Sequence, residues 1–356
     1  MAKIGLINMT NSITGWTNAA GNEMMSLRRM MEAMGHEVEI ISRKNIPEEN
    51  IIEFAEADIN KYEKLMVVPG NINFFGGVPN DNILNAYELV AKFDGILNVI
   101  LTDAKIGLQQ LWPSIKNRFE KEAWKDVNLT EEDVKLTQPV NVISLNSDFD
   151  WVRKKQISDT LEIIDIHHHD FDKFALWLNM HKEFPKVEKT CDLIYGGSFR
   201  SGMRLDKMED FLFNLGEDIK VETYGTLKEK QFKGEYEQKP EFGKKVKGDQ
   251  VINNNSRGLA TVVLGEANVD NKMTTARVWE SMLSHAVCFI DNDYDPDHKI
   301  IDTEFNYVYN KEDLIEKIKK LKEDPKFAEK VVSHQHEHMR KFDYKSWLKE
   351  FDKHVK

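Results

Sequence analysis

Several features that mark particular classes of protein are scarce or absent in this sequence of 356 residues. No apolar run reaches the length of a membrane span, and the first segment, MAKIGLINM, has the pattern of a strand rather than of a secretory signal. Only two cysteines occur, Cys191 and Cys288, each inside a segment expected to be a strand. We therefore expect buried thiols and a cytosolic protein, because disulfides belong mainly to oxidising compartments.

Positive charge is also in short supply. The chain carries 49 Lys and Arg against 60 Asp and Glu, a formal net charge of −11. This balance argues against indiscriminate binding of nucleic acid, but a local basic face remains compatible with it because affinity for phosphates depends on where the cations lie. With 41% hydrophobic residues, 31% charged residues and no internal repeat, the composition is that of a globular protein long enough for two domains.

Motifs for a bound metal are weak. The consecutive histidines in IHHHDFD (166–172) do not converge easily on one ion. In HQHEH (334–338), His334 and His338 share one helical face at a spacing that ligands can have, yet solvated or packed histidines are commoner in such a pattern. No dedicated pair of carboxylates stands out, so the sequence predicts no metal site.

Short apolar segments alternate with helical patterns along the whole chain. The first half predicts helices at about 22–34, before residue 64 and at 80–92, between strands at 3–9, 36–42, 64–70, 95–103 and 140–146. From about residue 185 the pattern starts again, with the strands TCDLIYGG, IKVETYG, GLATVVLG and AVCFIDN and with final helices at 310–322, 325–340 and 344–355. Continuous apolar strands separated by helices predict parallel sheets covered on both faces. We therefore expect two Rossmann-like domains facing a cleft, with ligands at the carboxyl ends of the strands.

The stretch IYGGSFRSGMR (194–204) has the pattern of a strand, a tight turn and the start of a helix. Its two consecutive glycines let the backbone turn close to a ligand. Arg200 and Arg204 lie four residues apart, near the helix N-terminus, where two cations oppose the helix dipole unless an anion lies between them. A surface turn whose arginines pair with nearby carboxylates is the alternative, and phosphate binding is the favoured interpretation.

The stretch TTARVWESM (274–282) predicts a second helix start at the end of a strand. Arg277 and Glu280 lie three apart on one helical face, where an intrahelical ion pair is the plain alternative. An arginine in a first helical turn favours an anionic ligand, and a glutamate can accept two hydrogen bonds from a ribose diol. Together with the turn at 194–204, this pattern indicates a nucleoside-diphosphate site in which three arginines neutralise the pyrophosphate.

Three stretches in the first half carry weaker signals. Asp103 ends the strand VILTD, where a carboxylate would point into the cleft as a general base, although a capping aspartate is the alternative. The loop PGNINFFGG (69–77) carries two adjacent phenylalanines that either stack on a base or fold back into the core. The mildly basic segment 105–125 either contacts a phosphate backbone or forms an ordinary solvated face.

Assembled in order, these stretches resemble one family. The sequence is similar to the DNA β-glucosyltransferases of T-even bacteriophages, which glycosylate 5-hydroxymethylcytosine in duplex DNA. The resemblance covers nearly the whole chain and is densest at INMTN, INFFGG, LTD, WPSIKNR, YGGSFRSGMR, EKQF and RVWESM. It implies a GT-B fold, an α/β architecture of two Rossmann-like domains with parallel sheets facing a central cleft. Residues 1–176, completed by a C-terminal helix at 340–356, would form the DNA side, and residues 177–339 the UDP-sugar side.

The resemblance also implies roles for individual residues. Asp103 would be the base that takes the proton from the hydroxymethyl group. The residues implied to bind UDP are Gly197, Ser198, Arg200, Arg204, Lys245, Val246, Arg277 and Glu280. Those implied to line the sugar pocket are Glu23, Asp172, Glu266 and Val269. Those implied to contact DNA are Asn73, Phe75, Gly76, Lys105 and Arg118.

Departures from the family cluster around the donor sugar. Glu266 and Val269 stand where the family has an aspartate and a tyrosine, and Asp172 stands where it has a glutamate. The loop after Arg118 is longer, and Gly107 replaces a proline. One methylene of carboxylate reach is enough to select another sugar outline, so the resemblance fixes UDP more firmly than glucose.

The sequence therefore predicts an inverting UDP-sugar transferase acting on 5-hydroxymethylcytosine in double-stranded DNA. UDP-glucose is the expected donor, and UDP-arabinose is the alternative. Two rival functions are a GT-B transferase acting on a small molecule or lipid, and a DNA-binding or nucleotide-sensing protein without catalysis. We expect a monomer in the cytoplasm of the host cell, with no membrane partner. Stimulation by Mg²⁺ or Mn²⁺ is left open by the sequence.

Overall fold

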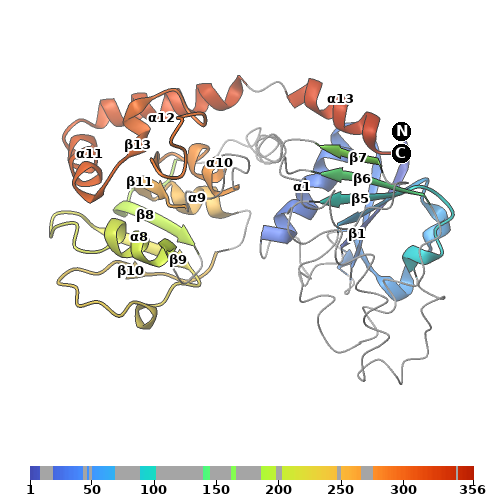
Figure 1. Ribbon diagram of the computed structural model, residues 1–356, viewed down its shortest axis with the longest axis horizontal. Coiled ribbons are helices and arrows are strands. Elements are labelled where there is room, and N and C mark those ends of the chain that lie inside the picture. Colours follow the sequence, from blue (N-terminus) through green and yellow to red (C-terminus); the bar gives the residue numbers. More distant parts are fainter. Residues whose placement is uncertain are drawn as a thin grey trace. The chain divides into compact units, whose positions relative to one another are not determined.

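A computed structural model describes residues 1–8, 19–42, 46–47, 50–68, 89–101, 139–144, 162–165, 186–197, 203–246, 250–265, 276–341 and 344–356. The chain divides into two compact units. Unit 1 comprises Met1–Phe171 together with Tyr344–Lys356, and unit 2 comprises Asp172–Asp343. Each unit contains its own parallel β-sheet (Figure 1). The predicted α/β architecture with two parallel sheets is confirmed.

The sheet of unit 1 has the strand order β3-β2-β1-β4-β5-β6-β7, and all of its neighbouring strands are parallel. Its strands are β1 (Lys3–Asn8), β2 (Glu37–Ser42), β3 (Ile51–Glu53), β4 (Lys64–Val68), β5 (Leu97–Leu101), β6 (Val140–Ser144) and β7 (Glu162–Asp165). Helix α1 (Ala19–Ala33) follows β1 and buries its methionines, as the Met-rich pattern predicts. Five of these strands were expected, whereas the short edge strands β3 and β7 were not.

The polar helix expected before residue 64 is wrong. The segment 50–63 instead forms β3 and two 3₁₀ turns, η2 (Phe54–Glu56) and η3 (Ile59–Lys61). Its buried side chains are Ile51, Phe54, Ile59 and Tyr62. Their spacing of three, five and three residues does not form the continuous stripe of an α-helix, so tertiary burial determines the local structure.

The sheet of unit 2 has the order β10-β9-β8-β11-β12-β13 and is also parallel. Its strands are β8 (Cys191–Gly197), β9 (Val221–Gly225), β10 (Glu241–Phe242), β11 (Gly258–Val263), β12 (Val287–Asp291) and β13 (Tyr307–Val308). Its helices are α8 (Met203–Leu212), α9 (Val251–Asn255), α10 (Ala276–Met282), α11 (Lys311–Glu323) and α12 (Pro325–Arg340). The predicted strands and final helices are present, and the short strands β10 and β13 were not anticipated.

Alternate residues of β12 show that helices cover both faces of this sheet. Val287 and Phe289 belong to a core cluster with residues of α8 and α11. Cys288 and Ile290 belong to a second cluster with residues of α10 and with Met339 of α12. Because successive side chains of a strand point to opposite faces, an apolar strand without alternation requires cover on both sides. The continuous apolar strands in the sequence are explained by this arrangement.

Both cysteines are free and buried, as predicted. Burial raises the pKa of the Cys191 thiol to about 12, and it also raises the pKa of the Cys288 thiol. Both side chains are therefore neutral packing groups at physiological pH. No helix in the described part of the chain is long and apolar enough to cross a membrane.

Helix α13 (Tyr344–His354) belongs to unit 1, and its last residues and the C-terminus lie at the amino ends of β5 and β6 (Figure 1). Asn98 and Asn141 are paired neighbours on β5 and β6, and both are buried. The Asn98 amide group donates to the carbonyl of Lys356 at 2.6 Å, and its oxygen accepts from the Lys356 N–H at 2.8 Å. Asn141 donates to the carbonyl of His354 at 2.5 Å. Two buried asparagines thus hold the C-terminal segment by its backbone.

We expect Asn98→Ala to release this segment and to destabilise unit 1. The substitution removes both hydrogen bonds to the backbone of Lys356, and it leaves the buried amide of Asn141 without one partner, at a cost of about 1–3 kcal/mol for that group. Hydrogen exchange should show faster exchange of the amides in 344–356, while the amides of α11 in unit 2 keep their protection. Unchanged protection of 344–356 would show that other contacts hold the segment.

Candidate active site

The candidate site lies at the carboxyl end of the sheet of unit 2, where three strand ends carry glycine. Gly196 and Gly197 end β8, Gly225 ends β9, and Gly265 lies two residues after β11. In parallel α/β sheets this edge is the one that binds ligands. The glycine pair expected to form a turn next to a ligand is therefore in the position that the sequence predicts.

Gly225 brings two of these strand ends into direct backbone contact. Its φ is +120°, and a β-carbon there would lie 2.0 Å from the carbonyl oxygen of Gly197. The same carbonyl accepts a hydrogen bond from the N–H of Thr226 at 3.2 Å. Only glycine permits both the backbone conformation and the close approach at this position.

Two buried tyrosines fill the space that the glycines leave. A β-carbon on Gly197 would lie 2.7 Å from the ring of Tyr195, and one on Gly196 would lie 2.3 Å from the ring of Tyr224. The Tyr224 hydroxyl donates to the side-chain oxygen of Asn255, on α9, at 2.7 Å. Side chains at either glycine would displace a ring, so the shape of the turn and the packing of the tyrosines depend on each other.

Arg277 of α10 rests on one of these tyrosines. Its guanidinium carbon lies 5.5 Å from the centroid of the Tyr195 ring, and its Nη1 donates to the Tyr195 hydroxyl at 3.4 Å. The arginine is partly exposed, whereas Tyr195 is fully buried. A cation on a fixed aromatic face is held in place while it keeps donors for an anionic ligand.

Glu280 and Arg277 both act on the buried hydroxyl of Tyr224. Burial raises the pKa of Tyr224 most, the charge of Glu280 raises it further, and the charge of Arg277 opposes the shift. Tyr224 therefore stays protonated, and it donates to Asn255. Both charges therefore lie near Tyr224, at the end of β9. Arg277 is the arginine predicted to bind the diphosphate, and Glu280 is the glutamate predicted to bind the ribose.

The segment after β10 supplies the last described part of the site. Val246 is partly buried and packs against the cluster formed by Cys191, Ile194 and Tyr224. Lys245 is exposed. The structure thus brings Val246 and Gly197, two positions implied to bind UDP, to the same pair of neighbouring strands.

The remaining predicted residues are placed only in part. Arg204 is the second residue of α8, and Glu23 lies within α1. Residues that lie outside the described part of the chain are Asn73, Phe75, Gly76, Asp103, Lys105, Arg118, Asp172, Ser198, Arg200, Glu266 and Val269.

The sequence did not identify three residues that support the glycine turn. They are Tyr195 and Tyr224, whose rings pack against the glycines, and Asn255, which accepts a hydrogen bond from Tyr224. The signal for Tyr195 was its place directly before the glycine pair. Tyr224 likewise directly precedes Gly225. Asn255 had no local signal, because its partner lies 31 residues away in the sequence.

Several described histidines pair with single carboxylates. Within the described residues no group of three or more His, Cys, Asp or Glu side chains is arranged to hold a metal ion. His334 lies 2.7 Å from the carboxylate of Asp302. The three consecutive histidines at 167–169 lie outside the described part of the chain.

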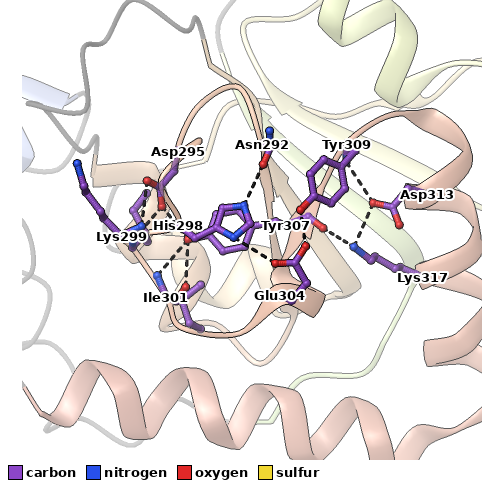
Figure 2. Close-up of polar contacts among 11 residues, drawn as sticks. Asn292, Asp295, His298, Lys299, Ile301, Glu304, Tyr307, Tyr309, Asp313 and Lys317 are labelled. Carbon is purple, nitrogen blue, oxygen red and sulfur yellow. Dashed lines mark hydrogen bonds and ion pairs between the residues drawn. The ribbon is translucent and has the colours of Figure 1, made fainter.

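The loop that follows β12 starts at the same carboxyl edge of the sheet, and a polar network holds the loop in place (Figure 2). Asp295 is buried and accepts from the N–H groups of Lys299 and Ile300, at 3.1 Å and 2.8 Å. It also accepts from the hydroxyl of Tyr307, on β13, at 2.7 Å (Figure 2). The loop is thereby tied to the neighbouring strand.

His298 adds a second tie at the same place. Its φ of +51° is unusual for a residue with a side chain, so surrounding contacts must stabilise it. Its ring stacks on Tyr307 with centroids 3.7 Å apart. The ring nitrogens lie 2.9 Å from the side-chain oxygen of Asn292 and 3.1 Å from the carboxylate of Glu304 (Figure 2).

Two parallel Rossmann-like sheets, one with a glycine-lined strand end beside an arginine and a glutamate, have the architecture of the GT-B class of glycosyltransferases. Comparisons with known proteins agree. The family model described as Bacteriophage T4 beta-glucosyltransferase matches residues 2–174. The DNA beta-glucosyltransferase of Enterobacteria phage T4 is 35% identical over 344 residues, which cover 95% of each chain. The chain belongs to the bacteriophage T4 beta-glucosyltransferase family, and it is a glycosyltransferase, as predicted.

Solved structures of the T4 phage enzyme share the fold over nearly their whole length. An aspartate-to-alanine mutant in complex with UDP-glucose is 33% identical, covers 99% of both chains and gives a TM-score of 0.83. The T4 enzyme in complex with UDP and Mn²⁺ gives 0.81 at 33% identity and the same coverage. An alpha-glucosyltransferase in complex with UDP and DNA is 13% identical, covers 100% of both chains, gives 0.64 and therefore shares the fold alone.

We expect Gly225→Ala to destabilise unit 2 more than Gly216→Ala, a matched glycine with φ of +107°. Both variants place alanine at a positive φ, which costs about 1–2 kcal/mol. A β-carbon at 216 would meet only the flexible carboxylate of Asp218, at 3.0 Å, whereas one at 225 meets backbone. Urea unfolding should show the larger loss for Gly225→Ala, and equal losses would contradict the close contact with Gly197.

Proposed function

We propose that this protein transfers glucose from UDP-glucose to the hydroxymethyl group of 5-hydroxymethylcytosine in double-stranded DNA, with inversion at the anomeric carbon. The similarity to a DNA beta-glucosyltransferase over 95% of the chain carries the proposal. The donor is α-linked in UDP-glucose, so a beta-glucoside can form directly only if the configuration inverts.

Unit 2 is proposed to bind the donor. Solved relatives hold UDP and UDP-glucose, and the described site places an arginine, a glutamate and a glycine turn at one strand edge. Arg277 would contact the diphosphate, and Glu280 the ribose hydroxyls. The other residues proposed to bind UDP are Gly197, Ser198, Arg200, Arg204, Lys245 and Val246.

Unit 1 is proposed to bind the acceptor DNA, as a monomer in the host-cell cytoplasm. Chemistry on a cytosine substituent requires the base to leave the stack, which costs a few kcal/mol. A loop that fills the vacated space offsets this cost, and INFFGG supplies the side chains for it. The residues proposed to contact DNA are Asn73, Phe75, Gly76, Lys105 and Arg118.

The reaction follows from these assignments. The hydroxymethyl oxygen attacks the anomeric carbon, Asp103 takes its proton, and the bond from that carbon to the UDP oxygen breaks. UDP leaves with its negative charge stabilised by Arg200, Arg204 and Arg277. A relative was solved with Mn²⁺. Such an ion would add charge neutralisation at the diphosphate, and we assign it no protein ligand.

The sugar pocket decides between glucose and arabinose. Glu23, Asp172, Glu266 and Val269 are proposed to line it, and three of these depart from the family pattern. Duplex DNA containing 5-hydroxymethylcytosine should be incubated with UDP-glucose or with UDP-arabinose, and its nucleosides then weighed by mass spectrometry. A hexose increment is the expected result. A pentose increment would show a changed sugar pocket, and no increment would contradict the DNA acceptor.

We expect Asp103→Asn to reduce turnover by about 10²–10⁴-fold while UDP affinity stays nearly constant, because the amide cannot accept the proton. Single-turnover assays and calorimetric titration with UDP measure the two quantities. Loss of both together would contradict the role of Asp103 as the base.

Arg277→Ala is the matched control, with the opposite pattern. It removes a charge-assisted contact to the diphosphate, so UDP affinity should fall by about tenfold or more. Unchanged affinity in the titration would remove Arg277 from the donor site.

A further inference from the structure

Lys207, in the second turn of α8, forms an ion pair that the proposed reaction does not use. Its ammonium group contacts the carboxylate of Asp291 and lies 2.9 Å from that of Asp293. Asp291 ends β12 and is buried, whereas Asp293 is largely exposed. Burial raises the pKa of the Asp291 carboxyl group, and Lys207 opposes that shift. The pair joins α8 to a strand two places from β8 in the sheet.

The carboxylates are the fixed partners in this contact. Asp291 belongs to a strand whose five residues are all buried. The loop that starts with Asn292 is tied to β13 through Asp295 and His298 (Figure 2). Because the carboxylates are held in place, their contact with Lys207 restrains helix α8.

The described core contacts of α8 lie mainly after Lys207. Among the described side chains of this helix, Met208, Phe211 and Leu212 are buried in the core. Before them, Leu205 packs against the core only as a partly buried residue. Arg204 lies three residues before Lys207, so the ion pair fixes the backbone from which this proposed diphosphate ligand extends.

The same loop also contacts the strand end that leads to the proposed sugar pocket. Tyr294 donates its N–H to the carbonyl of Asp291 at 2.8 Å. A β-carbon on Gly265 would lie 1.9 Å from the Tyr294 ring. Gly265 directly precedes Glu266, which is proposed to line the sugar pocket. One loop therefore contacts both Lys207 of α8 and the strand end that leads to this pocket.

We propose that Lys207 is a positioning residue for the nucleotide sugar. Held by Asp291 and Asp293, it fixes the first turn of α8 and thereby sets where Arg204 meets the donor diphosphate. The inference rests on the proposed function, because it assumes that the diphosphate binds at the start of α8.

A direct contact between the Lys207 ammonium and the diphosphate would predict the opposite response to one substitution. Asp293→Asn weakens the grip on Lys207 and removes a negative charge from the neighbourhood of an anion site. If Lys207 bound the diphosphate itself, UDP affinity would rise or stay unchanged. If Lys207 acts by positioning, UDP affinity falls, even though the loss of a negative charge would by itself favour binding of an anion.

Calorimetric titration with UDP tests the proposal. The unsubstituted full chain is compared with the variants Lys207→Met and Asp293→Asn. We expect a loss of affinity on the order of tenfold for Lys207→Met and a smaller loss for Asp293→Asn, because small displacements of binding groups have effects of this size. Lys207→Met also leaves the buried Asp291 charge without its partner. The double variant K207M/D291N removes both charges, and it should recover thermal stability without recovering UDP affinity.

Lys322→Met is the matched control. Lys322, on α11, pairs with Asp192 of β8 at 3.0 Å, at the amino end of the same sheet. It joins a helix to a strand as Lys207 does, so it should lower the melting temperature without changing UDP affinity.

The outcomes separate this inference from the proposed function. Failure of the unsubstituted protein to bind UDP would overturn the proposed function, and this inference with it. Binding by the unsubstituted protein, with unchanged affinity in Lys207→Met and in the double variant, would overturn the inference alone. Tighter or unchanged binding in Asp293→Asn, with weaker binding in Lys207→Met, would replace positioning by direct contact.

Discussion

A single contact between the main chain at two strand ends shapes the sheet edge of unit 2 that we propose to bind the donor. The end of β9 reaches the carbonyl of Gly197 because Gly225 has no side chain and adopts a positive φ. The rings of Tyr195 and Tyr224 occupy the space that side chains on Gly197 and Gly196 would need. Arg277 in turn rests on Tyr195. The position of the Arg277 cation therefore depends on the packing of the tyrosine rings, and this packing depends on the shape of the glycine backbone.

The two kinds of support for the proposed donor site differ in physical character. Beneath the glycine turn the support is steric, because rings and backbone are in contact and a single methyl group would displace them. Around α8 the support is electrostatic, because an ammonium group is held between a carboxylate at the end of β12 and one in the loop that follows it. Steric support fixes the turn that is proposed to face UDP. Electrostatic support holds the helix that is proposed to contact the diphosphate.

The sequence allowed much of the fold to be predicted, for identifiable reasons. Strands such as β8 and β12 are mostly apolar, and the final helices have strong 3.6-residue periodicity. The strands that escaped prediction are β3, β7, β10 and β13, which have two to four residues each and carry too little pattern to recognise. The expected polar helix before β4 failed because burial of widely spaced apolar residues, rather than propensity, determines that segment.

The candidate site was predictable where its signal was local. Arg277 and Glu280 are three residues apart, and the glycine pair adjoins a recognisable strand, so spacing alone identified them. The supports of the site join residues distant in the chain: 31 positions separate Tyr224 from Asn255, and 84 separate Lys207 from Asp291. A pair brought together only by the fold leaves no periodic trace in one sequence. Asp103 and the residues expected on the DNA side remain predictions.

The docking of the C-terminal segment has a consequence for the order in which the protein is made. Unit 1 is assembled from residues at both ends of the chain, and unit 2 is inserted between them. During synthesis, Asn98 and Asn141 leave the ribosome long before their partners His354 and Lys356 exist. Until translation has passed through all of unit 2, the amino ends of β5 and β6 lack these partners. Unit 1, which begins first, therefore cannot make these contacts until the last residues of the chain have been made.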